Sequence, residues 1–489
     1  ERELTGGNGM VEMGTFVAIL LGQVAGGLLV GIAGVGRHYV AFACVGVAVL
    51  GRLVAQAIPP SPSTDPGLRI NWNPVSETWR NLKLAHTNLV VFRSLLGISW
   101  MWFFGAAFLA QFPSFAKNVL HGDEQVASLL LVVFSVGIGI GSLLCEVLSR
   151  RHVEIGLVPL GAIGMSVFSI DLYFATRALP PSGGYALLAF LAEHAHWRVM
   201  ADLALLSLFA GLYSVPMYAL IQLRSQPSHR ARIIAANNIL NALFMIASAV
   251  IVGALLKSGV SVPQVFLVVG LLNAVVAGYI FLLVPEYLLR FVAFVVARLV
   301  YRFRIRGDEH IPTAGAAILV CNHVSFVDPV LLMAASPRPI RFIMDHRIFD
   351  TPGLGAFFRL AKAIPIASQK DDPRLYDEAF ARAGQVLDDG DLLCLFPEGG
   401  LSADGELGEF KGGVMKLLAR HPVPVVPVAL QNLWGSFFSR AGGKAMRKPF
   451  RRGVWSRVGL VAGPPLAAAE VSPAGLRERV GQLLAADGR

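Results

Sequence analysis

A histidine and an aspartate stand five positions apart in the C-terminal part of the chain, just after the short apolar run Ala316–Cys321. The residues from Asn322 to Asp328 read Asn-His-Val-Ser-Phe-Val-Asp. His323 can accept a proton from a hydroxyl, and a nearby Asp328 carboxylate can fix the ring tautomer and stabilise the imidazolium. The pair therefore predicts a general base that makes a substrate hydroxyl nucleophilic, with His323 and Asp328 as catalytic residues.

A second block follows another apolar run, Leu392–Leu395, and reads Phe-Pro-Glu-Gly-Gly-Leu-Ser from Phe396 to Ser402. Glycines let the backbone approach a ligand closely, backbone amides can hold an anion, and a lysine can neutralise it. The predicted substrate-binding residues here are Asn322, Phe396, Pro397, Glu398, Gly399, Ser402 and Lys411. The four cysteines are widely spaced and predict neither a metal site nor a disulfide.

Both blocks lie in a region, 305–489, where short apolar runs alternate with helical patterns. This alternation predicts an α/β domain with a mostly parallel sheet. The expected strands are Ala316–Cys321, Ile340–Met344, Ala363–Ile366, Leu392–Phe396, Val423–Leu430 and Val458–Ala462. The expected helices cover about 328–335, 353–361, 373–389, 412–420 and 472–486.

The rest of the chain has the composition of a membrane protein. Of the 489 residues 55% are hydrophobic and 15% charged, whereas soluble proteins carry about 25% charged residues. Because a spanning helix needs about 20 apolar residues, we expect a multi-pass α-helical bundle over 1–285, an interfacial or linker helix over 286–304, and the α/β domain over 305–489. The eight expected spans cover about 13–35, 38–58, 88–112, 124–148, 155–176, 199–221, 233–256 and 263–285.

The net charge of +10 fits basic loops and anionic lipid better than nucleic acid. Lys and Arg are richer in loop 59–87, near residue 150, in loop 222–232 and after the last span than in the opposite loops. This bias predicts a cytosolic α/β domain. A basic group could dock membrane lipid or an acidic carrier protein, or could simply be solvated: Arg304, Arg306, Arg447, Lys448, Arg451 and Arg452.

Polar residues inside the expected spans are costly, so each suggests a function. Asn237 and Asn241 share a helix face, and Glu12 lies at the entry of the first span. We predict that these three line a transport cavity; the alternative is that they only tie helices together. Small residues predict close helix packing at Gly22, Gly26, Gly27, Gly31, Gly137, Gly139 and Gly141.

The C-terminal blocks resemble the glycerolipid acyltransferase family, of the 1-acylglycerol-3-phosphate acyltransferase type. Its histidine–aspartate block, its Phe-Pro-Glu-Gly block and its valine–proline strand correspond to Asn322–Asp328, Phe396–Ser402 and Val423–Val428. The resemblance implies acyl transfer from acyl-acyl-carrier-protein or acyl-CoA, without a cofactor. Ser368 and Leu401 replace arginines that in the family are associated with the phosphate of lysophosphatidate. Their absence favours a lysophospholipid acceptor such as lysophosphatidylethanolamine, with Lys370 or Lys411 as the residue expected to bind its remaining negative charge.

The membrane part resembles the major facilitator superfamily in its loop 59–87 and in the segment Ser142–Arg151. The runs Gly7–Glu12 and Ile234–Phe244 are similar to lysophospholipid transporters of that superfamily. On this resemblance four more spans precede residue 1. The chain then looks like such a transporter, partly present, fused to the acyltransferase part of the bacterial 2-acylglycerophosphoethanolamine acyltransferase/acyl-acyl-carrier-protein synthetase.

The fusion implies a bacterial inner-membrane protein that flips a lysophospholipid inward and reacylates it. Its expected partners are membrane phospholipid and lysophospholipid, acyl carrier protein, and a fused or separate acyl-acyl-carrier-protein synthetase. Three alternatives remain open: a transporter whose soluble domain only binds lipid, a lysophosphatidate acyltransferase with a membrane domain, and a facilitator of a small polar solute.

Overall fold

The computed structural model describes residues 4–30, 32, 34–59, 71–149, 153–177, 179, 184–226, 228–436, 438–441 and 455–486. It divides into two compact units, Glu1–Leu282 and Leu283–Arg489. Several residues of the sequence-based predictions lie outside the described residues: Gly31, Arg150, Arg151, Arg447, Lys448, Arg451 and Arg452.

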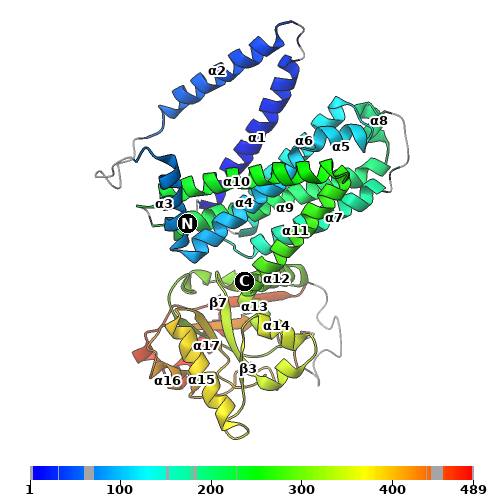
Figure 1. Cartoon of the computed structure of the whole chain (residues 1–489). Helices are drawn as coiled ribbons and strands as arrows, with labels where there is room; N and C mark the ends of the chain where they lie inside the picture. Colours follow the sequence, from blue (N-terminus) through cyan, green and yellow to red (C-terminus); the bar gives the residue numbers. More distant parts are fainter. Residues whose placement is uncertain are drawn as a thin grey trace. The chain divides into compact units, whose positions relative to one another are not determined.

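The first unit is helical (Figure 1), and eight of its described helices are long and apolar enough to cross a membrane. Its helices are α1 (Leu4–Val30), α2 (Gly36–Ala55), α3 (Pro74–His86), α4 (Leu89–Leu109), α5 (Phe112–Asn118), α6 (Glu124–Ser149), α7 (Leu157–Arg177), α8 (Leu187–Ala192), α9 (Ala195–Arg224), α10 (Arg230–Lys257) and α11 (Val262–Leu283). The third candidate span continues from α4 through α5 to Asn118. The predicted multi-pass helical bundle is confirmed.

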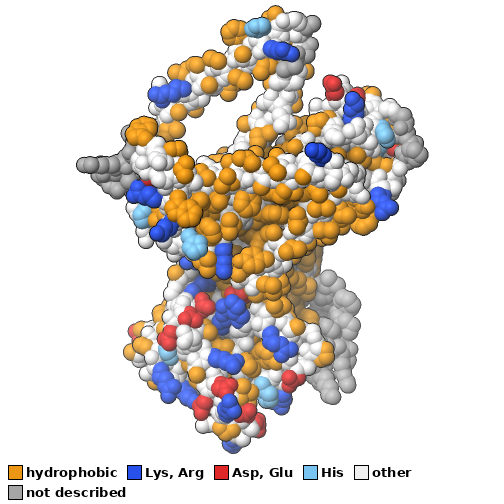
Figure 2. Space-filling view, in the orientation of Figure 1, with side chains coloured by type: hydrophobic (Ala, Val, Ile, Leu, Met, Phe, Trp, Pro, Cys, Tyr) orange, Lys and Arg blue, Asp and Glu red, His pale blue; other side chains and the backbone are white. Residues whose placement is uncertain are grey.

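The surface of this unit is apolar, as a lipid-facing surface must be. On α6 the exposed side chains Val136, Ile140, Leu143 and Val147 recur at helical spacing and form an outward stripe. Hydrophobic side chains cover much of the visible surface of the helical unit, whereas charged side chains are scattered over the visible surface of the second unit (Figure 2). The uneven hydropathy of the sequence therefore corresponds to two kinds of surface.

Glycines allow α6 and α9 to pack closely. A Cβ atom added at Gly141 would lie 2.0 Å from the Leu208 carbonyl oxygen, and one at Gly137 would lie 1.9 Å from Ser207 Oγ. Close packing is confirmed for these two glycines. It is wrong for Gly22, Gly26 and Gly27, which have no neighbour within 4 Å because this part of α1 extends away from the other described helices.

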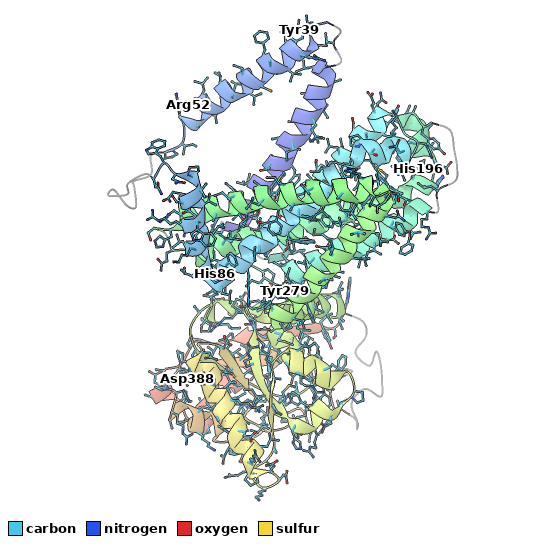
Figure 3. All side chains as sticks on the ribbon, viewed as in Figure 1. Tyr39, Arg52, His86, His196, Tyr279 and Asp388 are labelled. Carbon is cyan, nitrogen blue, oxygen red and sulfur yellow. The ribbon has the colours of Figure 1, made fainter. Side chains whose placement is uncertain are left out.

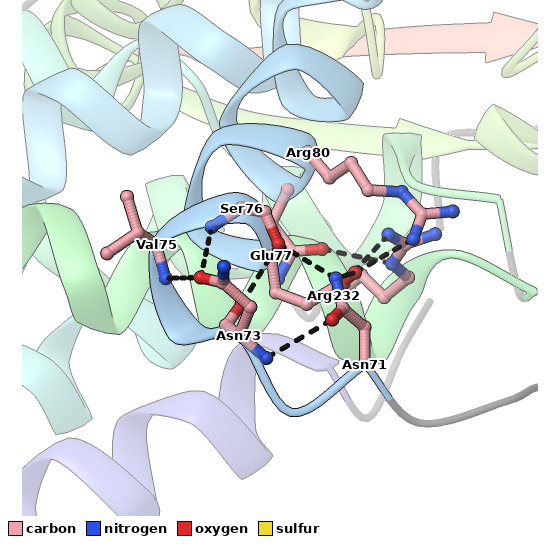
Figure 4. A network of polar contacts seen from close by, with 8 residues as sticks. Asn71, Asn73, Val75, Ser76, Glu77, Arg80 and Arg232 are labelled. Atoms are coloured by element: carbon pink, nitrogen blue, oxygen red, sulfur yellow. Dashed lines mark hydrogen bonds and ion pairs between the residues drawn. The ribbon is translucent and has the colours of Figure 1, made fainter.

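The predicted loop 59–87 contains a helix, α3, in its described part. The Asn73 side chain caps this helix by accepting from the amides of Val75 (3.0 Å) and Ser76 (3.1 Å) (Figure 4). Glu77 forms ion pairs with Arg80 of α3 and Arg232 of α10. Hydrogen bonds from Asn71 and Arg80 lower the pKa of Glu77, so the carboxylate that links α3 to α10 stays ionised.

The second unit is an α/β/α sandwich around a seven-stranded sheet of order β1-β7-β6-β2-β5-β3-β4. Its strands are β1 (Arg302–Arg306), β2 (Ala317–Cys321), β3 (Ile340–Asp345), β4 (Ile364–Ile366), β5 (Leu392–Leu395), β6 (Val425–Gln431) and β7 (Arg457–Ala462). Its α-helices are α12 (Pro285–Val300), α13 (Asp328–Ala335), α14 (Leu354–Leu360), α15 (Pro373–Asp388), α16 (Gly413–Leu418) and α17 (Pro473–Ala485). All pairings are parallel except β6 with β7, which confirms the predicted mostly parallel sheet.

Both faces of the sheet are covered, which explains why the central strand β2 is apolar throughout. Ala317, Leu319 and Cys321 pack in the core that includes α12 and α13. Ile318 and Val320 point to the other core, which includes α15, α16 and α17. β2 therefore runs through the middle of the unit and ends where the histidine block begins.

The predicted helix 286–304 is too long at its C-terminal end. α12 ends at Val300, and Arg302–Arg306 form β1, which pairs with β7. The alternation of arginine with Phe303 and Ile305 is a strand pattern of period two, and it explains the change. α12 belongs to the second unit: its Glu286 contacts Arg341 (3.4 Å) and Lys362 (2.9 Å).

We predict that Gly141→Ala weakens the bundle, because the new methyl group would overlap the backbone of α9. Overpacking of this kind costs about 1–3 kcal/mol. Gly26→Ala is the matched control, since nothing lies within 4 Å of that position. The thermal unfolding midpoint of the detergent-solubilised chain should fall for Gly141→Ala alone; equal midpoints for the two variants would contradict the packing.

Candidate active site

The histidine and the aspartate form a hydrogen-bonded pair at the C-terminal end of β2. His323 Nδ1 lies 2.9 Å from Asp328 Oδ2. The same carboxylate oxygen accepts from the amides of Val324 (2.8 Å) and Ser325 (2.9 Å). In neutral His323 this arrangement keeps the proton on Nδ1 and leaves the lone pair of Nε2 free to accept a proton.

Burial sets the electrostatics of the pair. Asp328 is buried, and burial raises its pKa, while the hydrogen bond from His323 opposes that rise. The His323 side chain is 18% exposed, so the ring reaches the surface while its partner does not. Burial also raises the thiol pKa of Cys321 and Cys394, which makes both poor nucleophiles. The arrangement suits a histidine base better than a cysteine nucleophile.

The Phe396–Ser402 block follows β5, the strand beside β2, and contacts both the ring and the backbone of His323. The Phe396 ring stacks on the His323 ring, with centroids 4.1 Å apart. Glu398 Oε1 accepts from the His323 amide at 2.8 Å, and Oε2 accepts from the Gly408 amide at 3.0 Å. Glu398 was predicted to bind substrate, but both of its carboxylate oxygens accept hydrogen bonds from backbone amides. We therefore assign Glu398 the role of positioning the loop that carries His323.

Two other residues predicted to bind substrate also form hydrogen bonds within the protein. The Asn322 side chain is buried and pairs with the backbone of Leu430 on β6, accepting at 2.8 Å and donating at 3.1 Å. Ser402 donates its amide to the His323 carbonyl (2.8 Å), and its hydroxyl accepts from the Gly405 amide (2.9 Å). Asn322 and Ser402 therefore hold the loops around His323 together. Pro397 also links two loops, because its carbonyl accepts a hydrogen bond from the Lys411 amide at 2.9 Å.

The predicted cations lie at different distances from the pair. Gly399 has a φ of +73°, and a Cβ atom there would lie 2.4 Å from Lys411 Nζ, so the exposed Lys411 side chain crosses the glycine turn. The exposed Lys370 follows β4, which is three strands from β2. At about 4.8 Å per strand, β4 itself lies about 14 Å from β2. The structure thus brings Lys411 to the Phe396–Ser402 block, and a role of Lys370 in substrate binding stays a prediction.

One basic residue that the sequence did not reveal lies against the histidine block. The Phe326 amide donates to the Phe438 carbonyl at 3.1 Å, and Ser325 and Ser439 form an isolated β-bridge. This contact places the guanidinium of the exposed Arg440 6.0 Å from the centroid of the Phe326 ring. No sequence motif links Arg440 to the histidine block, so its position there becomes visible only in the three-dimensional structure.

A pocket of about 190 Å³ adjoins the same loops. It opens beside Asn322 and Val324 and is otherwise lined mainly by the 405–407 turn, the end of β6 and the residues after it. Its apolar lining includes Val324, Leu407, Leu430, Leu433, Trp434 and Leu484. Its polar lining includes Asn322, Glu406 and Asn432, so the pocket offers both apolar and polar contacts.

A second histidine–aspartate pair provides a contrast within the same unit. His421 Nδ1 lies 2.8 Å from Asp388 Oδ1 (Asp388 is labelled in Figure 3), but this carboxylate is 59% exposed. His421 precedes β6 and Asp388 precedes β5, so the pair lies at the amino ends of parallel strands. Ligands of α/β sheets bind at the carboxyl ends, which is where His323 stands.

The three predicted transport residues lie together inside the helical unit. Glu12 of α1 and Asn237 and Asn241 of α10 are all buried. With the Asn241 amide rotated by half a turn, its oxygen accepts from Asn237 Nδ2 at 3.1 Å. The bundle therefore contains a buried polar cluster, which extends to side chains on α4 and α9.

Comparison with known proteins agrees with these two units. Residues 302–431 match the family model described as Acyltransferase. The 1-acyl-sn-glycerol-3-phosphate acyltransferase LPAT1 of Arabidopsis thaliana is 33% identical over 133 residues, which cover 27% of this chain and 36% of that protein. The lysophospholipid transporter LplT of Klebsiella pneumoniae subsp. pneumoniae is 29% identical over 231 residues, 46% of this chain and 52% of that protein.

Among solved structures, the 1-acyl-sn-glycerophosphate acyltransferase PlsC of Thermotoga maritima is similar to this chain with a TM-score of 0.33 and 22% identity. The match covers 41% of this chain and 77% of PlsC. The chain spans about a third to a half of the length of the curated relatives above. It thus joins an acyltransferase domain to a region similar to lysophospholipid transporters, as the sequence predicted.

We predict that Glu398→Gln lowers catalytic activity because the loop that carries His323 is no longer held in place. A glutamine presents one oxygen to two backbone donors, which leaves one amide unpaired at a cost of about 1–3 kcal/mol. Movement of the His323 loop should lower the turnover number by about tenfold to a hundredfold. Glu409→Gln, at a neighbouring exposed position, is the control. Unchanged turnover in Glu398→Gln would show that the two hydrogen bonds do not position the base.

Proposed function

We propose that the α/β unit transfers an acyl group from a thioester, acyl-acyl-carrier-protein or acyl-CoA, to the free glycerol hydroxyl of a lysophospholipid, and that the helical unit delivers that lipid across the membrane. The observation that carries the enzymatic part is the 2.9 Å contact between His323 Nδ1 and the buried Asp328, inside the matched acyltransferase region. The similarity to a lysophospholipid transporter supports the delivery.

In the proposed reaction His323 Nε2 takes the proton of the acceptor hydroxyl as its oxygen attacks the thioester carbonyl. Asp328 holds the ring and stabilises the imidazolium. The tetrahedral intermediate collapses, the carbon–sulfur bond breaks, and the histidine returns the proton to the leaving thiolate. The products are the acylated phospholipid and a free thiol, and the step needs no covalent enzyme intermediate.

The oxyanion of the intermediate needs hydrogen-bond donors. The Gly399 amide is not free for this role, because it donates to the Phe396 carbonyl at 3.0 Å. The amides of Gly400 and Leu401 make no hydrogen bond within the described part of the chain, and they follow the same turn. We assign the oxyanion donors to these two amides.

The charge around the site favours an acceptor with a phosphodiester. Lys411 and Arg440 are exposed single cations, and Ser368 and Leu401 replace the arginines of the resembling family. A phosphate monoester carries up to about two negative charges at neutral pH, and a zwitterionic phosphodiester such as lysophosphatidylethanolamine has no net charge. The smaller positive charge of this site suits the second acceptor. The adjoining pocket presents apolar side chains at Val324, Leu433 and Trp434, against which an acyl chain would pack.

We predict that His323→Ala lowers acyl transfer by a factor on the order of 10³ or more, because general base catalysis is lost. His421→Ala is the matched control, since it removes the other histidine–aspartate pair at the opposite edge of the sheet. The assay follows labelled acyl transfer by the whole chain in lipid vesicles. Near-normal turnover of His323→Ala would refute the assignment of the base.

We predict that the wild-type chain prefers lysophosphatidylethanolamine to lysophosphatidate as acceptor. Arg440→Ala should raise KM for lysophosphatidylethanolamine by about tenfold, the value of a charge-assisted hydrogen bond, with little change in the turnover number. Arg420→Ala, an exposed arginine beside His421, is the control. A wild-type preference for lysophosphatidate would overturn the acceptor, and an unchanged KM would remove Arg440 from the site.

A further inference from the structure

An arginine on α17 holds the loop that joins β5 to α16. Arg477 donates through Nε to the Gly408 carbonyl and through Nη2 to the Leu407 carbonyl, both at 3.0 Å. A guanidinium presents its donors in a rigid fork, so one side chain can hold two successive carbonyls. Arg477 lies beyond residues 302–431, the part of the chain that matches the acyltransferase family. The contact therefore connects the catalytic loops to a helix outside that region.

α17 is a firm support for this arginine because it is fixed along its length. The Ser472 side chain caps its first turn by accepting a backbone hydrogen bond at 3.1 Å. Leu476 and Val480 are buried in the core that α17 shares with α15 and α16. At the other end, the Gln431 side chain of β6 donates to two carbonyls of α17 and its C-cap, at 2.8 and 2.9 Å. Arg477 thus projects from a helix that is anchored to the sheet.

Gly408 connects Arg477 to the proposed base. Its carbonyl accepts from Arg477, and its amide donates to Glu398 Oε2 at 3.0 Å. The other oxygen of the same carboxylate accepts from the His323 amide at 2.8 Å. A Cβ atom added at Gly408 would lie 3.0 Å from Glu398 Oε2, so the approach of the two residues is close. Hydrogen bonds through Gly408 and Glu398 therefore link Arg477 to His323.

The loop needs such a contact because it has no regular structure of its own. Residues 402–408, all of them described, form neither helix nor strand. The Ser402 hydroxyl accepts from the Gly405 amide at 2.9 Å, which closes a local turn. The Ser402 amide ties the first end of the segment to the His323 carbonyl at 2.8 Å. Arg477 ties the second end to α17, so both ends of the segment have a defined place.

We propose that Arg477 is a positioning residue for acyl transfer: through Gly408 and Glu398 it keeps His323 where the ring can take the proton of the acceptor hydroxyl. The proposal rests on the proposed function, because it names a further residue on which that reaction depends. A displacement of about 1 Å can slow an enzymatic step about a hundredfold. Loss of the guanidinium should therefore lower the turnover number rather than weaken substrate binding.

The kinetic test measures acyl transfer by the whole chain in lipid vesicles, with lysophosphatidylethanolamine and lysophosphatidate as acceptors. Arg477→Ala should lower the turnover number by about tenfold and leave KM for the acceptor within about twofold. Arg477→Lys should retain more activity than Arg477→Ala, because an ammonium can still donate to one of the carbonyls. Arg479→Ala, which removes an exposed arginine two residues further along α17, should match the wild type.

Two further measurements separate positioning from a general loss of fold. Arg477→Ala and Glu398→Gln both release Gly408, and effects within one hydrogen-bond network are not additive. The double variant should therefore be at most about threefold slower than Glu398→Gln alone. In hydrogen–deuterium exchange of Arg477→Ala, the amides of residues 398–408 should exchange faster, while those of α17 and β6 keep wild-type protection.

An unchanged turnover number in Arg477→Ala would overturn the proposal. Two other results would also overturn it, since each means that Arg477 only stabilises the fold: losses that multiply in the double variant, and faster exchange throughout α17. If the wild type acylates neither acceptor, the proposed function fails instead, and the exchange data still decide whether Arg477 holds the loop. If Arg477→Ala does not fold, Arg477→Lys replaces it in the exchange and double-variant comparisons.

Discussion

The parallel pairing of β2 with β5 on one side and β6 on the other is the constraint from which the candidate site follows. Val320 pairs with Leu395, and Cys321 pairs with Val428, so the three strands end at the same edge of the sheet. Segments far apart in sequence must meet there, since adjacent strands lie about 4.8 Å apart. A slip of one residue would turn β2 over and send the core face of Leu319 to the other layer.

The acidic residues Asp328 and Glu398 at this edge accept hydrogen bonds mainly from backbone amides. Asp328 accepts from two amides besides His323, and Glu398 accepts from the amides of His323 and Gly408. Each carboxylate thereby fixes one end of the short segment that carries the histidine. The site consequently presents to solvent the His323 ring and exposed cations, because both of these acids are engaged with the loops they hold.

The sequence predicted the parts of the fold that depend on local pattern. Runs such as Ala316–Cys321 are apolar because both faces of the sheet are covered, so their burial is visible in composition alone. β1 was missed because its arginines continue the basic character of α12, and the alternating Phe303 and Ile305 were too few to stand out. The end of the helix was therefore placed four residues too late.

Roles within the site were harder to predict than its location. Residue types located the site because a histidine, an aspartate and a glycine turn each followed a predicted strand. They could not show that Asn322, Glu398 and Ser402 form hydrogen bonds with backbone groups, because these backbone groups belong to segments distant in the sequence. Arg440 depends on the bridge between Ser325 and Ser439, a tertiary contact with no local signal.

The charges of the loops around His323 bear on the acceptor of the proposed acyl transfer. Lys411 crosses the turn at Gly399, and Arg440 lies against the Phe326 ring, so both exposed cations belong to these loops. Asp328 and Glu398 place no free carboxylate there, because each accepts hydrogen bonds from backbone amides. A phosphate monoester carries up to about two negative charges at neutral pH and calls for more cations than a phosphodiester does. We infer that two single, exposed cations suit a zwitterionic phosphodiester headgroup better than a phosphate monoester.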